Sequence, residues 1–245
     1  ELLARALHDM THALRRRIDA TEAFAADVTH ELKNPLASLR SAVDSLERVE
    51  DPALKRRLLE VVRDDAMRLD RLVVDIAEEA RLDAELSRSR FEPVDLGGLI
   101  DAMLPGWEAR APEGVRIAFA RPLTGTAVAM GDEARLARVL DNLVDNAMSF
   151  SPRPGLVAVR AAGDGEQVAV TVEDEGPGVP EAQREAVFRR FHSVREDAAF
   201  GRHSGLGLSI AKAIVEAHDG TIAVESRPDG RPGARFLVRL PAAQP

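Results

Sequence analysis

Residues 24–36 read Phe24-Ala25-Ala26-Asp27-Val28-Thr29-His30-Glu31-Leu32-Lys33-Asn34-Pro35-Leu36 and place a histidine, an acid and an amide close together. Apolar residues recur in steps of three and four, at Phe24, Val28, Leu32, Leu36, Leu39, Val43 and Leu46. This spacing predicts a helix with one buried stripe. His30 lies off the stripe, with Asn34 one turn further on the same face. The pattern therefore predicts chemistry on the outside of a helical bundle.

The composition excludes several classes of protein. A net charge of −8 with interspersed acids and bases gives no support for nucleic-acid binding. The absence of cysteine excludes disulfides and thiolate metal sites. No apolar run approaches the roughly 20 residues needed to cross a bilayer. We interpret the chain, which begins at Glu1 without a signal-like stretch, as a soluble piece of a longer protein whose membrane anchor could lie upstream.

Residues 1 to about 90 contain no glycine and read as nearly continuous helix. The first break is expected at Glu50-Asp51-Pro52, where Asp51 can cap a second helix that has Pro52 at its first position. A hairpin of two helices leaves half of its apolar stripe exposed unless it pairs with another hairpin. We therefore expect a homodimer that forms a four-helix bundle.

From about residue 91, glycine and proline become common and short β-like runs alternate with helical ones. This texture predicts a mixed α/β sandwich with helices on one face of the sheet, although the order of the strands cannot be derived from periodicity. The expected strands are Val115–Ala120, Thr126–Met130, Leu156–Ala161, Val168–Glu173, Thr221–Glu225 and Ala234–Leu240. The expected helices are Leu96–Arg110, Glu133–Met148, Glu181–Arg190 and Leu206–Ala217.

Four segments of this second half have the chemistry of a nucleotide site. Asn142 and Asn146 are four residues apart on one helix, and their amides suit Mg²⁺ or phosphate. Asp174, Gly176 and Gly178 follow an apolar strand, where an aspartate can accept a hydrogen bond from an amine and glycines admit a ligand close to the backbone.

The other two segments are aromatic and glycine-rich. Residues 187–191 supply the aromatic side chains of Phe188 and Phe191. Gly205, Leu206 and Gly207 open a helix whose free amides favour phosphate. Each segment alone is more often a polar helix face, a turn or core packing. Their joint occurrence downstream of His30 is hard to obtain by chance.

In this combination the chain resembles the catalytic part of a sensor histidine kinase of two-component systems. His30–Pro35 resembles the H box, Asn142–Asn146 the N box, Asp174–Gly178 the G1 box, Phe188–Phe191 the F box and Gly205–Gly207 the G2 box. The resemblance covers most of the chain from Ile18 to Leu240. Residues 24–39 and 81–86 most resemble sensors of the ChvG type.

The resemblance implies an α-helical hairpin in a dimeric four-helix bundle, followed by an α/β sandwich of the Bergerat type that binds ATP. The implied domains are residues 1–20, the end of a HAMP-like signalling helix, residues 21–90 for dimerisation and phosphotransfer, and residues 91–245 for catalysis. Asp174 would hold the adenine amine, and Asn146 would coordinate Mg²⁺ beside Asn142. Residues 179–204 would form a mobile lid over the ATP.

The implied function is ATP-dependent phosphorylation of His30 and transfer of the phosphoryl group to an aspartate of a response-regulator receiver domain. Glu31 is expected to orient the imidazole. Asn34 is expected to place a water that dephosphorylates the regulator. The implied location is the cytoplasmic portion of a sensor in a bacterial inner membrane.

Four positions depart from the family pattern. Ser149 stands where a cation is frequent, Phe150 replaces a tyrosine, and Arg202 and His203 stand where glycines are common. These departures leave an alternative open, namely a signalling scaffold that binds nucleotide without catalysis. An unrelated ATPase of the same sandwich type, such as a chaperone or repair protein, would have no need of the His30 helix.

Overall fold

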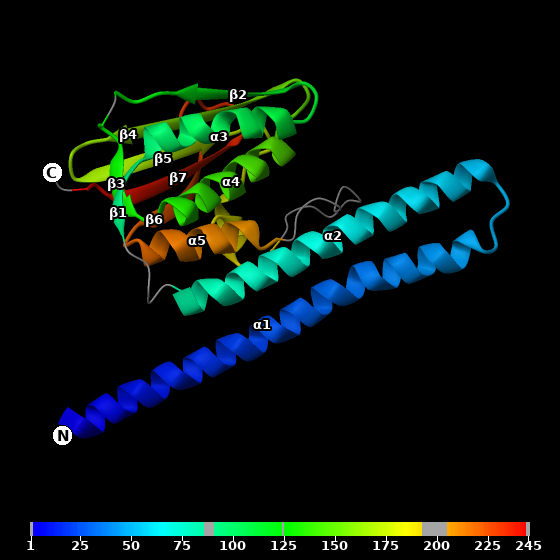
Figure 1. Cartoon of the computed structure of the whole chain (residues 1–245), viewed down its shortest axis with the longest axis horizontal. Coiled ribbons are helices and arrows are strands. Elements are labelled where there is room, and N and C mark those ends of the chain that lie inside the picture. The colour runs from blue at the N-terminus through cyan, green and yellow to red at the C-terminus, as the bar shows by residue number, and fades with distance from the viewer. Residues whose placement is uncertain (1, 86–90, 124, 193–204, 244–245) are drawn as a thin grey trace. The chain divides into compact units, whose positions relative to one another are not determined.

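The computed structural model describes residues 2–85, 91–123, 125–192 and 205–243 (Figure 1). The chain divides into two compact units, one containing Glu1–Ala77 and the other containing Glu78–Val194 and Gly205–Pro245. Each unit is described by itself.

The first unit is built on a hairpin of two long helices, α1 (Leu2–Leu46) and α2 (Pro52–Glu85). The predicted break is confirmed: Asp51 Oδ1 accepts a hydrogen bond of 2.8 Å from the backbone N of Ala53, and Pro52 is the first residue of α2. Helix α1 continues through Pro35. In the described part of the chain, neither of these helices nor any other is apolar enough over a sufficient length to span a bilayer.

The apolar stripe of α1 is only partly covered within one chain. Leu36 and Val43 were expected to be buried, but their side chains are 54% and 47% exposed. This expectation is wrong for a single chain, because α2 covers only one side of α1. Large apolar side chains are exposed on both helices: Met10, Ile18, Leu36, Val43, Leu54, Leu59, Val61, Met67, Val73 and Val74.

The second unit contains a five-stranded sheet with the order β2-β4-β5-β7-β6. Strands β2 and β4 run parallel, and the other neighbours are antiparallel. The five strands are β2 (Val115–Ala120), β4 (Gly155–Gly163), β5 (Gln167–Glu173), β6 (Thr221–Ser226) and β7 (Ala234–Pro241). A separate antiparallel pair joins β1 (Glu92–Asp95) to β3 (Val128–Gly131).

Three helices lie together on one side of the sheet, as the sequence predicts (Figure 1). They are α3 (Leu96–Arg110), α4 (Glu133–Phe150) and α5 (Gly207–Ala217). The helix expected over residues 181–190 is wrong: the structure has two 3₁₀ turns there, η1 (Glu181–Gln183) and η2 (Ala186–Phe188). The buried side chains of these turns are Val187 and Phe188 alone, too few for the apolar face that sustains a longer α-helix.

His218 links the end of α5 to the beginning of α4 by hydrogen bonds, and so helps to position the helix that carries Asn142 and Asn146. Its Nε2 accepts a hydrogen bond of 3.1 Å from the backbone N of Asp132, and its Nδ1 lies 2.7 Å from the carbonyl oxygen of Ile214. The Phe91 ring stacks on the imidazole at 4.4 Å. The side chain is almost fully buried, and this burial lowers the pKa of His218 below its usual value.

This arrangement predicts an acid-sensitive contribution to stability. The unfolded chain takes up the His218 proton more readily than the folded one, so the free energy of unfolding should decrease as the pH falls below about 6.5. The variant His218→Gln should lose about 1–2 kcal/mol of stability at neutral pH and show a weaker pH dependence. Urea unfolding followed by the fluorescence of Trp107 at about pH 7.5 and about pH 5.5 measures both effects. His12→Gln, which removes an exposed histidine of α1, is the control. If the free energy of unfolding of His218→Gln depended on pH as strongly as that of the wild type, this assignment would be contradicted.

Candidate active site

His30 and Asn34 are both exposed on α1, one helical turn apart. The sequence predicts this orientation, because neither residue belongs to the apolar stripe. A nitrogen of the His30 ring is therefore open to a reactant, and the Asn34 amide is open on the same face.

Glu31 contacts the opposite helix of the hairpin. Its Oε2 lies 3.2 Å from Nη2 of Arg68 on α2, and both side chains are largely buried. Arg68 is not predictable from the sequence, because nothing in its local pattern shows that it meets a residue 37 positions earlier. An ion pair shielded from water is stronger than an exposed one, so this contact fixes the Glu31 carboxylate on the α2 side.

In the second unit, Asn142 and Asn146 lie on α4, and Oδ1 of Asp132 caps the first turn of this helix by accepting a hydrogen bond from the backbone N of Arg135. Nδ2 of Asn142 is buried, and no hydrogen-bond partner for it exists among the residues that the structure describes. A β-carbon on Gly207 would lie 3.2 Å from Oδ1 of Asn142. The glycine thus keeps open the space beside an amide that lacks a partner, and a buried unpaired donor is costly unless a ligand or water satisfies it.

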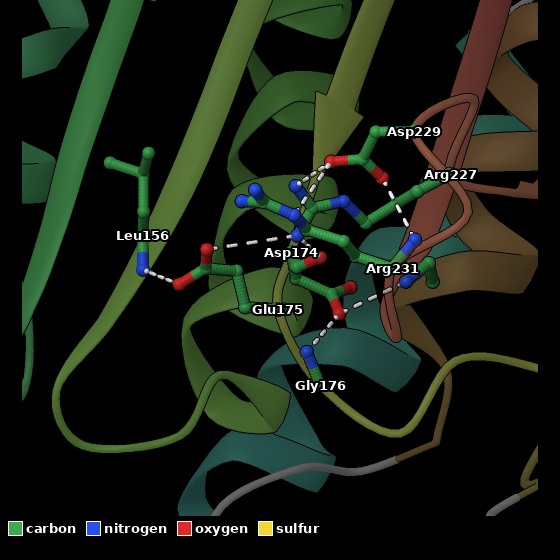
Figure 2. A network of polar contacts seen from close by, with 8 residues as sticks. Leu156, Asp174, Glu175, Gly176, Arg227, Asp229 and Arg231 are labelled. Atoms are coloured by element: carbon green, nitrogen blue, oxygen red, sulfur yellow. Dashed lines mark hydrogen bonds and ion pairs between the residues drawn. The ribbon is translucent and has the colours of Figure 1, made fainter.

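Asp174 is almost fully buried at the end of β5. Its Oδ1 accepts hydrogen bonds from the backbone N of Gly176 at 2.8 Å and of Ala234 at 3.1 Å (Figure 2). Within the described residues Oδ2 makes no hydrogen bond, so one oxygen remains as an acceptor. Burial raises the pKa of Asp174, while the two amide hydrogen bonds and the Arg227 charge oppose that rise.

The two glycines after Asp174 are required by the shape of the loop. A β-carbon on Gly176 would lie 2.7 Å from the carbonyl oxygen of Phe150. Gly178 has φ +78°, and a β-carbon there would lie 2.8 Å from the carbonyl oxygen of Gly233. These close approaches hold the loop against the end of α4 and the turn before β7.

A backbone hydrogen bond of 2.9 Å runs from Phe191 N, which lies within the expected lid of residues 179–204, to the carbonyl oxygen of Gly205, the residue that follows the lid. Both residues have positive φ, 56° at Phe191 and 74° at Gly205. Leu206 is buried, and in the described part of the chain no side chain caps the first turn of α5, which begins at Gly207. Residues 193–204, including Arg202 and His203, lie outside the described residues.

The described side chains fit a magnesium nucleotide. The free Oδ2 of Asp174 suits an amine, the unpaired Nδ2 of Asn142 suits a phosphate oxygen, and the amide oxygen of Asn146 suits a hard cation. Magnesium bound beside phosphates needs only one or two protein ligands. These three residues are predictable from the sequence because each stands in a short motif.

Two families of known proteins match the chain. Residues 20–85 match the His Kinase A (phospho-acceptor) domain, and residues 131–244 match the histidine kinase-, DNA gyrase B- and HSP90-like ATPase.

Among curated proteins, the sensor protein ChvG of Agrobacterium fabrum is 41% identical over 99% of this chain and 42% of its own length. ChvG of Rhizobium meliloti is 43% identical over 98% of this chain and 44% of its own length. The chain thus spans less than half the length of these relatives.

Solved structures agree with these matches. The mycobacterial sensor histidine kinase MprB is 31% identical, with a TM-score of 0.54 over 63% of this chain and 99% of that one. ShkA in complex with AMPPNP is 30% identical, with a TM-score of 0.62 over 90% of this chain and 46% of that one. ThkA in complex with the response regulator protein TrrA is 25% identical, with a TM-score of 0.72 over 94% of this chain and 64% of that one. With both domains matched in this order, the chain belongs to the sensor histidine kinases.

Proposed function

We propose that this chain transfers the γ-phosphoryl group of ATP to His30 and then to an aspartate of a response-regulator receiver domain. The observation that carries the proposal is that one chain combines an exposed histidine on a helical hairpin with a polar site suited to a magnesium nucleotide. The AMPPNP complex of ShkA and the TrrA complex of ThkA support the nucleotide and the partner.

The nucleotide would be held by the residues of the second unit. Oδ2 of Asp174 would accept a hydrogen bond from the adenine amine, with Gly176 and Gly178 leaving room for the base. Nδ2 of Asn142 and the backbone amides of Gly205, Leu206 and Gly207 would meet phosphate oxygens, while Phe191 would close the site beside them. Asn146 would contribute a ligand to Mg²⁺, which when bound neutralises charge that develops on the phosphates.

In the transfer to His30, a ring nitrogen forms a bond to the γ-phosphorus as the bond to the β-phosphate oxygen breaks and ADP leaves. The imidazole becomes cationic and must lose the proton on its other nitrogen. Glu31 is the adjacent carboxylate, and the contact of its Oε2 with Nη2 of Arg68 at 3.2 Å would compete with this role. We therefore propose that Arg68 restrains Glu31 in the resting hairpin.

The exposed apolar residues of α1 and α2 support a homodimeric four-helix bundle, since isolated hairpins rarely leave so much apolar surface in water. We propose the domain limits given above: residues 1–20, 21–90 and 91–245. We also propose that the chain is the cytoplasmic portion of a longer bacterial inner-membrane sensor, and that the membrane segment lies outside this chain.

A scaffold that binds nucleotide without catalysis is the less favoured alternative. Its motivation is Ser149, whose hydroxyl donates a hydrogen bond of 3.0 Å to the carbonyl oxygen of Asn146 and supplies no cation to a phosphate. Incubation of the purified chain with ATP labelled on the γ-phosphate separates the two functions. The proposed kinase acquires a label that is labile to acid, stable to base and located on His30. The scaffold binds ATP and acquires no label.

Asn34 gives a prediction that separates autophosphorylation of the chain from dephosphorylation of the regulator. The variant Asn34→Ala should autophosphorylate at a rate within about twofold of the wild type, because Asn34 is not the nucleophile. The rate at which this variant dephosphorylates the regulator should fall by about tenfold or more, since the amide no longer positions the attacking water. Loss of label from purified phosphorylated regulator, with and without the chain, measures the second rate. Ser38→Ala, one turn further along α1, is the control. Equal losses of both activities in Asn34→Ala would refute the assigned role.

A further inference from the structure

The turn between β6 and β7 (residues 227–233, here the β6–β7 turn) contacts the loop that carries Asp174. None of the recognised motifs includes this turn. Asp174 N donates a hydrogen bond of 3.0 Å to the carbonyl oxygen of Ala234, and Ala234 N returns one of 3.1 Å to Oδ1 of Asp174. The proline- and glycine-rich sequence of this segment predicts a turn, but it does not predict what the turn supports.

Arg227 stands at the centre of this support, as Figure 2 shows. Its Nη2 donates to Oδ2 of Asp229 at 2.8 Å, which fixes the guanidinium within the turn. Its Nη1 lies 3.4 Å from the carbonyl oxygen of Asp174 and 3.7 Å from Oε1 of Glu175. The side chain is only 12% exposed, so these charges act with little screening by water.

Glu175 holds the same loop from the other side. Its Oε2 accepts a hydrogen bond of 2.9 Å from the backbone N of Leu156 in β4. The residue after Asp174 is thus clamped between a strand of the sheet and Arg227 (Figure 2). This clamp limits the movement of the backbone that aims the Asp174 carboxylate.

The charge of Arg227 also bears on the protonation of Asp174. Because Oδ1 already accepts two amide hydrogen bonds, a proton would attach to Oδ2 and turn the free acceptor into a donor. Burial raises the pKa of Asp174, and Arg227 is the charged side chain that lowers it. The other charged groups of this network are Glu175, Asp229 and Arg231. Glu173, the residue before Asp174, is paired with Arg235 of β7.

We infer that Arg227 is a positioning residue for adenine recognition: it orients the Asp174 carboxylate through contacts with the backbone of the loop, and it keeps Oδ2 an acceptor. This inference rests on the proposed function, in which Asp174 binds the adenine amine. Arg227 would not touch the nucleotide, and acts through the Asp174 backbone and the Glu175 carboxylate.

The test measures the affinity of the full chain for ADP, which has no γ-phosphoryl group to transfer, by calorimetry at several pH values. In Arg227→Gln, affinity at about pH 8 should fall roughly tenfold, and the loss of affinity on acidification should begin at a higher pH than in the wild type. Arg227→Lys should recover part of both effects, since it restores the charge without the forked contacts. The ADP phosphates titrate equally in every variant.

Arg231→Gln is the matched control, because its guanidinium is 75% exposed and lies 3.9 Å from the same Asp229. We expect affinity within about twofold of the wild type and an unchanged pH profile. If the role of Arg227 were purely structural, Arg227→Gln would have a lower unfolding midpoint, and the pH profile of its ADP affinity would match that of the wild type. If Arg227→Gln does not fold, Glu175→Gln serves as the second variant, since it keeps an acceptor for Leu156 N and removes the charge that faces Arg227. Glu175→Gln should weaken ADP binding by about threefold or more.

Arg227→Gln with the affinity and pH profile of the wild type would overturn the inference, as would a Glu175→Gln that binds normally where Arg227→Gln is unfolded. A wild-type chain that binds no ADP would instead overturn the proposed function. The two failures are therefore distinguishable.

Discussion

Autophosphorylation is expected to fall at least about a thousandfold when His30 is replaced by alanine, because the nucleophile is then absent. His30 is exposed on α1 and outside the apolar stripe, so its removal should leave the helical hairpin intact. ATP binding should also remain, since the nucleotide site is built from the other unit. The measurement is the incorporation of γ-labelled phosphate into the purified chain, with ATP affinity measured by calorimetry in parallel.

His12→Ala is a suitable control, because it removes another exposed histidine from the same helix. It should incorporate label at the rate of the wild type. Label that persists in His30→Ala would contradict the assignment of His30, and mass spectrometry of the modified peptide would then identify the true acceptor.

The local elements could be predicted from the sequence where short-range rules apply. The apolar repeat from Phe24 to Leu46 predicts a helix, and the Asp51-Pro52 pair predicts where the next one starts. Strand β1 (Glu92–Asp95) was missed because four residues including Pro93 give no alternating pattern. The strand order β2-β4-β5-β7-β6 depends on pairings between distant segments, which periodicity does not encode.

The residues of the candidate site also divide into those that the sequence predicts and those that it does not. Asn142, Asn146, Asp174 and the glycines were found because spacing along the chain reveals them. Arg68 and Arg227 were not found, because they act on residues 37 and 53 positions away. Both arginines hold acidic segments of the candidate site in place, a role that becomes visible only when the chain is folded.

Replacing Asp174 with asparagine is expected to weaken ATP binding about a hundredfold, with little loss of stability. The asparagine Oδ1 can still accept from the backbone N of Gly176 and Ala234, so the loop should keep its shape. An NH₂ group then replaces Oδ2, and it would face the adenine amine donor to donor. The loss of a hydrogen bond to a charged group, together with this repulsion, accounts for about two powers of ten.

The comparison with Glu113→Gln, a carboxylate-to-amide change at an exposed position before β2, isolates the effect of position. Calorimetric affinity for ATP and urea unfolding followed by Trp107 should agree between that control and the wild type. Asp174→Asn should also lose the part of the acid dependence of binding that arises from Asp174, whose pKa is raised by burial. Binding of ATP by Asp174→Asn with normal affinity would mean that the base lies elsewhere, because an amide nitrogen cannot accept the hydrogen bond that the buried carboxylate is positioned to accept.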